Sequence, residues 1–588
     1  MGVRILSNSF VDYLNSMNNA TSGNINALAE AQVTNKYYNY IRVDRKLGKF
    51  IVNKIKQGDH RTYILTGHAG DGKTSILVQV LRDLNLLHQG EKLKVSDTLT
   101  NNEISIMYVK DMSELSEGKQ IELLKESLEA PKNNISSILI SNTGPLIKSF
   151  NTLFAENEHD CDEIEDILIK QLDTNTNEPV NIHGYDFNLI NIARVENLGF
   201  VKEVINKICT EDLWTKCCGC KNEEKCPMYF NKKYVSSNKS RVIDFVETYY
   251  RFLQENDKRV TIRQMIAQIS YAFTGNIKCQ NINSFDNRMY NKFNFNFANL
   301  FFGYRGIQQV QSAKQIKGID LIQNLLLDSV SLKEDYSMFV KGDFSNFPLE
   351  IREIIEDVWK TFAKEVYHIE DEDKSIVDKQ NEMRKAIRRF FLIYGLTENN
   401  DELQELFDQI YGKMFTLYKK CTTAAQSPRK LREIRRTIYE ALYIKNIGVP
   451  PTSSDSLYLT LTRHDGDFQN VFLMLGKAKE SELEVIQISR NIDIEDIAEG
   501  FTLQLNINGE NQKIKLTLPL LMYFASVVNG EISTEINPSL SHGLAELNAL
   551  LLREFRVESK NQMQIIVNTV SGAKEIKIEF EDGKMFVN

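Results

Sequence analysis

The chain has 588 residues, of which 42% are hydrophobic and 26% are charged, and its formal net charge is −8. This balance is ordinary for a soluble protein of roughly three to five domains, and the negative charge argues against a protein that coats nucleic acid along its whole length. Because the chain has neither a secretion signal nor a run of about 18 apolar residues, we expect a cytoplasmic protein without membrane attachment and without a disulfide framework.

The pattern of apolar residues changes along the chain and predicts six segments. Apolar strands that alternate with amphipathic helices predict a parallel α/β sheet, and Asn508-Gly509 between two alternating stretches predicts a β-hairpin. In chain order the predicted segments are a helical N-terminal segment (1–45), an α/β core (46–204), a cysteine-rich knuckle (205–235), a helical lid (236–345), a helical domain with a basic segment (346–449) and a β-rich α+β domain (450–588).

A glycine-rich stretch, GHAGDGKTS, follows a short apolar strand and opens an amphipathic helix. It satisfies the pattern G-x-x-x-x-G-K-[ST], in which backbone N–H groups and the helix N-terminus bind phosphates, the lysine reaches the β- and γ-phosphates and the threonine binds Mg²⁺. We therefore predict an α/β P-loop NTPase with an AAA-like parallel sheet that binds ATP and Mg²⁺. The predicted nucleotide-binding residues are Gly67, His68, Ala69, Gly70, Asp71, Gly72, Lys73, Thr74 and Ser75.

Polar residues end the next strands of the predicted sheet. Asp111 is the candidate to hold Mg²⁺ through water together with Thr74, although no second acid follows it, because the next residue is Met112. Glu114 could orient the attacking water, but a glutamate in the first turn of a helix would look the same.

Asn142 lies where ring-type ATPases place a γ-phosphate sensor, and asparagine is also a common residue at the end of a strand. Arg194 and Arg263 could each supply a cation to the phosphates, although exposed arginines are common. Lys73, Asp111, Glu114 and Asn142 form the predicted catalytic set.

Five cysteines lie within 18 residues and predict a metal site: Cys209, Cys217, Cys218, Cys220 and Cys226. Cys217-x-x-Cys220 with Cys226-Pro227 is typical of zinc knuckles in cytosolic proteins, and a tetrahedral site requires a fourth ligand, which Cys209 or Cys218 would supply. A set of buried reduced thiols and an iron–sulfur cluster are the alternatives. The absence of histidine favours a structural zinc.

Five motifs occur in an order that resembles a known family: GHAGDGKTSIL from Gly67, YVKDMSEL from Tyr108, LISNTGPL from Leu139, W-x-x-C-C-x-C-x5-C-P-M-Y-F-N from Trp214 and VTIRQMIAQISYAFTG from Val260. Over roughly residues 50–300 the chain resembles DptF, the ATPase-like subunit of phosphorothioation-dependent DNA restriction in bacteria. The resemblance implies a P-loop ATPase that acts with partners similar to DptG and DptH on DNA that lacks backbone sulfur, while the modified DNA of the host is spared.

Three functions fit these observations. The leading hypothesis is an ATP-dependent subunit of such a defence complex, contacting DNA directly or through partners. The excess of Lys and Arg between residues 379 and 445 could serve DNA contact or form a solvated helical face. The alternatives are a STAND-type signalling NTPase that oligomerises as a nucleotide switch, and a scaffold that binds nucleotide without turnover. No nuclease motif is found, so we expect a partner to cut the DNA.

Overall fold

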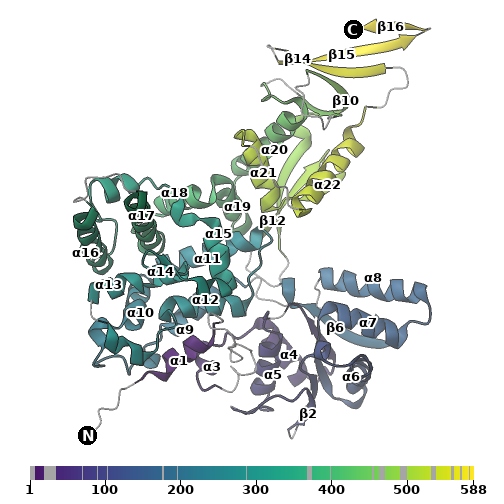
Figure 1. Cartoon of the computed structure of the whole chain (residues 1–588). Coiled ribbons are helices and arrows are strands. Elements are labelled where there is room, and N and C mark those ends of the chain that lie inside the picture. The colour runs from purple at the N-terminus through teal and green to yellow at the C-terminus, as the bar shows by residue number, and fades with distance from the viewer. Residues whose placement is uncertain are drawn as a thin grey trace, which may run out of the picture. The chain divides into compact units, whose positions relative to one another are not determined.

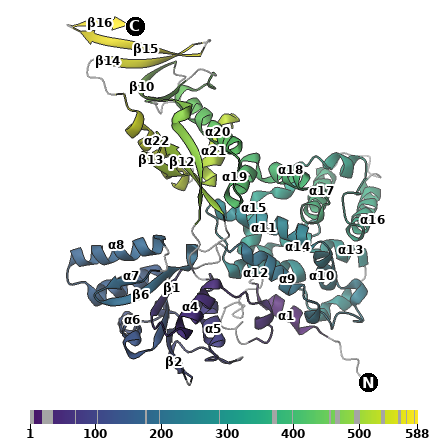
Figure 2. The same cartoon turned by 180° about the vertical axis from the view of Figure 1, so that it is seen from behind.

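The computed structural model divides the chain into two compact units, each of which we describe by itself (Figures 1 and 2). Unit 1 comprises Met1–Arg251, Arg259–Glu398 and Ile492–Ala498, and unit 2 comprises Phe252–Lys258, Asn399–Asn491 and Glu499–Asn588. The structure describes residues 7–18, 35–68, 70–88, 90–101, 103–174, 178–194, 197–285, 288–366, 374–397, 399–452, 456–461, 470–490, 500–531, 538–557, 562–569, 572–581 and 583–587.

Unit 1 contains a six-stranded, mostly parallel sheet with the strand order β2-β3-β4-β1-β6-β5. The four central strands run parallel to one another, and each edge strand is antiparallel to the strand beside it. The strands are β1 (Thr62–Thr66), β2 (Ser96–Thr100), β3 (Ser105–Val109), β4 (Ser136–Ile140), β5 (Val180–Ile182) and β6 (Tyr185–Asn191). The parallel α/β sheet predicted from the sequence is therefore confirmed.

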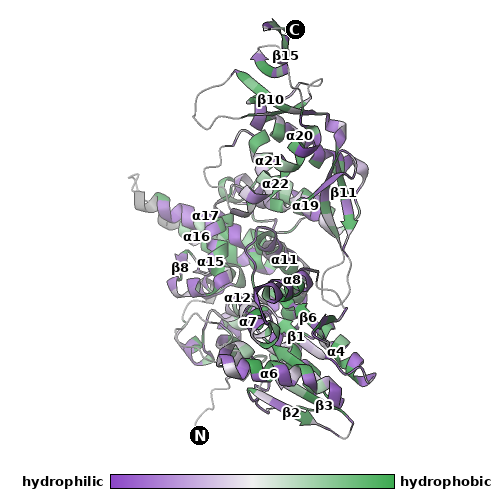
Figure 3. Cartoon of the chain, turned by 90° about the vertical axis from the view of Figure 1, so that its right-hand side faces the viewer, coloured by the Kyte–Doolittle hydropathy of each residue, from purple (hydrophilic) through white to green (hydrophobic). Residues whose placement is uncertain are grey.

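Helices cover both faces of this sheet. On one face Ile51 of α4 (Lys46–Lys56) and Ile76 of α5 (Lys73–Asp83) belong to the same apolar core as Tyr63 and Leu65 of β1. On the other face Ile64 packs with α6 (Glu117–Glu129), α7 (Thr143–Phe154) and α8 (Glu158–Thr174). Figure 3 shows both hydrophobic and hydrophilic residues along α6, as expected of a helix with one buried face. The carboxyl ends of the parallel strands therefore share one edge, where ligands bind in open α/β sheets.

The rest of unit 1 is mainly helical and also contains a two-stranded sheet of β7 (Tyr304–Arg305) and β8 (Gln308–Gln309). Within it, the fully buried guanidinium of Arg389 donates to Asp328 Oδ2 at 2.6 Å, to Asn299 Oδ1 and to the Gly306 carbonyl. The helices are α1 (Ser9–Ser16), α3 (Tyr38–Ile41), α9 (Gly199–Ile208), α10 (Pro227–Ser237), α11 (Lys239–Glu255), α12 (Ile262–Thr274), α13 (Arg288–Asn294), α14 (Phe297–Phe301), α15 (Lys317–Leu325), α16 (Leu349–Val366) and α17 (Lys374–Tyr394).

Unit 2 combines helices with two antiparallel sheets, β16-β15-β14-β10-β9 and β11-β12-β13. Its helices are α18 (Asn400–Tyr411), α19 (Lys413–Thr423), α20 (Pro428–Ile447), α21 (Leu518–Val528) and α22 (Pro538–Phe555). Its strands are β9 (Leu457–Thr460), β10 (Val471–Ala478), β11 (Leu483–Ser489), β12 (Phe501–Ile507), β13 (Gln512–Lys515), β14 (Gln562–Thr569), β15 (Gly572–Glu581) and β16 (Lys584–Val587).

The predicted hairpin in unit 2 is present. β12 pairs with β13 from Ile507 opposite Gln512, so residues 508–511 form the turn, in which both Asn508 and Gly509 have positive φ. The strand ends earlier than the alternating pattern suggested, because Leu518 begins α21 with Pro519 in its first turn, where a missing N–H costs nothing. Among the described helices, none is both long and apolar enough to span a membrane.

Candidate functional site

The glycine-rich loop (residues 67–72) joins the buried strand β1 to the start of α5. Gly67, Gly70 and Gly72 all have positive φ, at 144°, 93° and 92°. These angles are readily adopted by glycine alone, which explains the residue type at each position. Gly72 is the N-cap of α5, so the free N–H groups of the first helical turn open onto the loop. Ala69 lies outside the described residues.

Lys73 turns back onto this loop. Its ammonium donates to the carbonyl oxygens of Gly67 at 2.6 Å and His68 at 3.1 Å. The side chain is 7% exposed, and this burial is the main cause that lowers the pKa of Lys73, while the carboxylates of Asp71 and Asp111 oppose the shift. The cation is therefore held beside the loop, close to the first turn of α5.

The loop is held from one side by Asp71 and Arg259. The buried Asp71 Oδ2 accepts the His68 N–H at 2.9 Å and lies 3.2 Å from Arg259 Nη1, whose guanidinium also donates to the Ile192 carbonyl. Burial lowers the pKa of Arg259, and the nearby Asp71 carboxylate acts in the opposite direction. This ion pair ties the loop to the chain that follows β6.

The start of α12 packs against the same loop. Thr261 caps α12 and forms a reciprocal capping box with Gln264, and the Arg263 N–H donates to the Gly70 carbonyl at 3.4 Å. A Cβ on Gly70 would lie 2.9 Å from Thr261 Oγ1, closer than real contacts allow. The loop therefore fits closely against the capped end of this helix.

The predicted acid and amide lie at the ends of β3 and β4, the strands that follow β1 across the sheet. Asp111 is half-buried, accepts the Ser113 N–H at 3.0 Å, and its charge acts on Lys73. Asn142 is exposed at the N-cap of α7, and its backbone N–H donates to Ser113 Oγ at 2.7 Å. Ser113 therefore links the two strand ends, and the structure brings Asp111 toward Lys73.

The remaining predicted residues differ in how closely they approach the loop. Glu114 is exposed at the end of the short 3₁₀ turn η2 (Met112–Glu114), while Thr74 and Ser75 are half-buried in the first turn of α5. Arg263 is near enough for its charge to act on Lys73. The side chain of Arg194 lies outside the described part of the structure.

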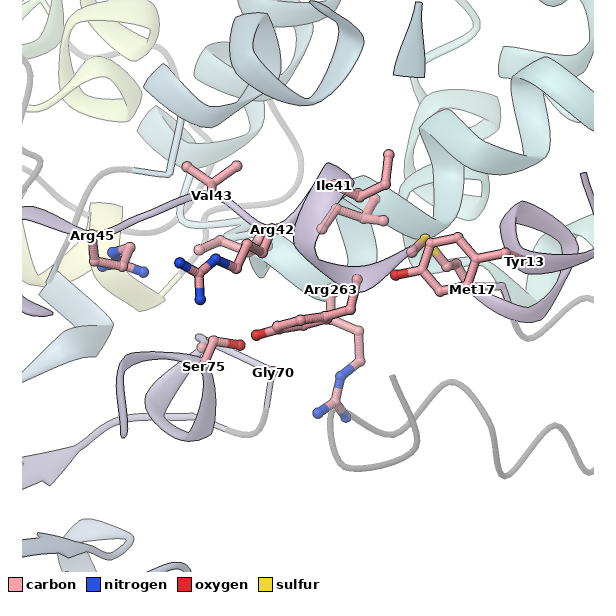
Figure 4. Close-up of a pocket in the computed structure, with 13 residues that line it drawn as sticks. Tyr13, Met17, Ile41, Arg42, Val43, Arg45, Gly70, Ser75 and Arg263 are labelled. Atoms are coloured by element: carbon pink, nitrogen blue, oxygen red, sulfur yellow. The ribbon is translucent and has the colours of Figure 1, made fainter. Parts of the chain in front are cut away.

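A largely apolar pocket of about 120 Å³ adjoins the loop (Figure 4). Its walls come from α1, from the chain between α3 and α4, from the loop with the start of α5, and from α12. The lining residues that Figure 4 labels are Tyr13, Met17, Ile41, Arg42, Val43, Arg45, Gly70, Ser75 and Arg263. The pocket therefore offers an apolar surface directly beside the N–H groups of the loop.

The predicted cysteine cluster divides into two sets. Cys217, Cys220 and Cys226 line a second cavity, of about 650 Å³, together with Cys279. Cys209 is buried near Ser236 and Cys218 is exposed near Tyr229, and neither lines that cavity.

Burial raises the pKa of Cys217 to about 11 and that of Cys226 to about 12, with smaller contributions from the neighbouring thiols. In the described part of the chain, no three His, Cys, Asp or Glu side chains are already gathered around one metal position.

Some of the basic side chains between residues 379 and 445 form ion pairs. Arg388 binds Asp335, Arg389 binds Asp328, Arg435 binds Glu480, and Arg436 binds Glu440. These pairs reduce the local positive potential that DNA contact would use.

Comparison with protein-family models, with curated proteins and with solved structures finds no match to this chain.

Sequence reasoning missed three parts of this region. Arg259 and Cys279 lie far along the chain from their partners, so no local spacing connected them to Asp71 or to the cysteine cluster. The apolar wall at Tyr38 and Ile41 was also missed, because an ordinary amphipathic segment gives no sign of a pocket. The capping pattern Thr261-x-x-Gln264 was readable and would have marked the helix end that packs on the loop.

Proposed function

We propose that this chain is a P-loop ATPase that binds ATP and Mg²⁺ at the glycine-rich loop. The observation that carries the proposal is the loop itself, with three positive-φ glycines, the free N–H groups of α5, and the Lys73 ammonium bonded to two loop carbonyls. Oriented N–H groups with a helix N-terminus and a lysine form an anion site suited to a triphosphate. Phosphate oxygens would replace the two carbonyls as partners of Lys73.

Each neighbouring residue has a part in this proposal. The adenine base would enter the apolar pocket beside Ser75, and Thr74 would bind Mg²⁺ directly. Asp111 would hold Mg²⁺ through water, which its charge interaction with Lys73 supports. Asn142 would sense the γ-phosphate and Glu114 would orient the attacking water.

We further propose that ATP turnover serves a multi-protein bacterial complex that restricts DNA lacking phosphorothioate. The support is the order of the five sequence motifs that resemble DptF, including the glycine-rich loop and the capped helix packed against it. Subunits similar to DptG and DptH would be the partners, and DNA would be engaged directly or through them. The structure of unit 1 is compatible with this function, since both motifs meet at one site.

Nucleotide binding can be separated into its phosphate and base contributions. Lys73→Ala is expected to weaken both ATP and tripolyphosphate binding at least about tenfold, because a charged phosphate contact is worth roughly 1.5–3 kcal/mol. Val43→Trp fills the pocket and is expected to weaken ATP binding while leaving tripolyphosphate binding unchanged. Lys49→Ala, which removes an exposed lysine of α4, is the control. Equal calorimetric affinities for ATP in the wild type and Lys73→Ala would overturn the site.

Turnover requires a second experiment. The complex reconstituted with its partner subunits is expected to hydrolyse ATP faster when unmodified DNA is added, and Lys73→Ala should abolish this stimulation. Equal rates of ATP hydrolysis by the wild-type and Lys73→Ala complexes, with or without DNA, would contradict the role in restriction. ATP-driven oligomers of the isolated chain, without DNA stimulation, would instead favour the signalling switch.

A further inference from the structure

Four thiols from two distant segments meet around one cavity in unit 1. Cys217, Cys220 and Cys226 come from the loop that precedes α10, and Cys279 begins the 3₁₀ turn η7 (Cys279–Ser284) that follows α12. All four line the same space of about 650 Å³, next to Asn8.

The loop that carries three of these cysteines has a defined backbone. The Cys217 carbonyl accepts the Cys220 N–H at 3.2 Å, and Gly219 between them has a φ of 72°. Cys226 is the N-cap of α10. A metal-bound thiolate at this position would also lie at a helix N-terminus, where negative charge is stabilised.

Cys279 is brought to this loop by contacts that do not involve sulfur. Asn222 Nδ2 donates to Asn283 Oδ1 at 2.9 Å, and Lys225 donates to the Asn283 carbonyl at 3.3 Å. These bonds hold η7 against the cysteine loop, although the two segments are far apart in sequence. The shared cavity is therefore built by two braced segments.

Asn8 closes the cavity from the third side. Its buried side-chain amide donates to the Leu213 carbonyl at 2.9 Å and to Cys217 Sγ at 3.4 Å. An amide donor of this kind orients a metal-bound sulfur and stabilises its charge.

We propose that Cys217, Cys220, Cys226 and Cys279 together hold a metal centre through four thiolates. A tetrahedral Zn²⁺ and an iron–sulfur cluster use the same ligand set, and both release the thiol protons on binding. Lys216, Lys221, Lys225 and Glu223 line the cavity, and the three lysines offset part of the negative charge of four thiolates. The fourth ligand is thus Cys279, in place of Cys209 or Cys218.

Metal content tests the centre without any nucleotide. The full chain, purified without oxygen from cells supplied with zinc and iron, is expected to carry about one zinc, or about four iron and four sulfide with visible absorption. Either result supports the four-thiolate centre and identifies the metal. Less than about 0.3 equivalents of zinc and less than about 0.3 equivalents of iron, before and after loading in vitro, would overturn the four-thiolate centre.

Matched serine variants test the ligand set. Cys279→Ser is expected to lower the metal content at least about fivefold, whereas Cys209→Ser and Cys218→Ser should retain the wild-type content. If Cys279→Ser kept its metal while Cys209→Ser or Cys218→Ser lost it, the assignment of Cys279 as the fourth ligand would be overturned.

Thiol labelling answers the same question in the wild-type protein and avoids a variant that fails to fold. In the metal-loaded chain, Cys218 should be alkylated rapidly and the four proposed ligands slowly, and removing the metal should expose all four together. Alkylation of Cys279 as fast as that of Cys218 in the loaded protein would contradict the proposal.

Discussion

Gly70 is the residue at which the glycine-rich loop comes closest to α12. Gly70→Ala would place a Cβ 2.9 Å from Thr261 Oγ1 at a φ of 93°. We expect the loop to move and ATP affinity to fall at least about tenfold, equivalent to about 1.4 kcal/mol.

The matched control is Gly184→Ala in the turn between β5 and β6. Gly184 has a φ of 81° and no atom within 4 Å of the added Cβ. It shares the backbone strain of about 1–2 kcal/mol but should leave ATP affinity unchanged in a titration. An equal loss of affinity in the two variants would show that strain, and not contact with α12, is responsible.

We expect the buried thiol of Cys421 to make the stability of unit 2 depend on pH. Burial raises the pKa of this thiol from 9.0 to about 11. Between these values the unfolded chain loses the proton and the folded chain keeps it, so stability falls as the pH rises, by up to about 3 kcal/mol. Urea midpoints of unit 2 measured from about pH 8 to about pH 11 should fall less steeply in Cys421→Ala, and parallel curves would contradict this assignment.

The residues of the loop were predictable because their chemistry is local. The loop conformation is predicted by the fixed spacing of three glycines, a lysine and a threonine, and the structure has positive φ at all three glycines. Arg259 was not predictable, because it acts on the loop through an ion pair with Asp71, which lies 188 positions away in the sequence. Cys279 was missed for the same reason.

Among the helices, α17 is joined to the turn that follows α15 by a buried ion pair. Arg389 is fully buried, and its partner Asp328 lies 2.6 Å away in the 3₁₀ turn η9 (Leu327–Ser329). Asp328→Ala would leave the guanidinium buried without its carboxylate, and we expect a loss of about 3–5 kcal/mol in the stability of unit 1.

The control for this prediction is Asp320→Ala. Asp320 pairs with Lys317 at 3.6 Å on an exposed helical surface, where such pairs contribute less than about 1 kcal/mol. Chemical denaturation of the two variants should separate them clearly. A similar small loss in both would mean that water or another residue replaces Asp328.

Elements were predictable where burial produced a clear pattern. β1, β3, β4 and β6 are apolar and were expected as parallel strands, whereas β2 (Ser96–Thr100) is polar at an edge and β5 has three residues. Edge strands need few apolar residues, so hydrophobic pattern alone does not reveal them. The turn at Asn508-Gly509 was predictable because its chemistry is as local as that of the glycine-rich loop.

At the scale of the whole molecule, the division into two compact units predicts two unfolding transitions. The proposed ATP site lies entirely in unit 1, so Mg-ATP at about 100 times its dissociation constant should stabilise one transition by about 2.7 kcal/mol and leave the other in place. Calorimetry of the full chain tests this, and Lys73→Ala should remove the shift. One common transition, or two that shift equally, would contradict it.

The short helix α1 contributes to the apolar pocket beside the glycine-rich loop, and its N-cap residue lines the cysteine-lined cavity. Asn8 at its N-terminus donates to Cys217, while Tyr13 and Met17 line the pocket beside the glycine-rich loop. A ligand that orders α1 at one end lowers the entropy cost of binding at the other. Such coupling is reciprocal, so the factor by which a bound metal tightens ATP binding must equal the factor by which ATP tightens metal binding. In a cell that is short of one ligand, the protein would then also bind the other ligand more weakly.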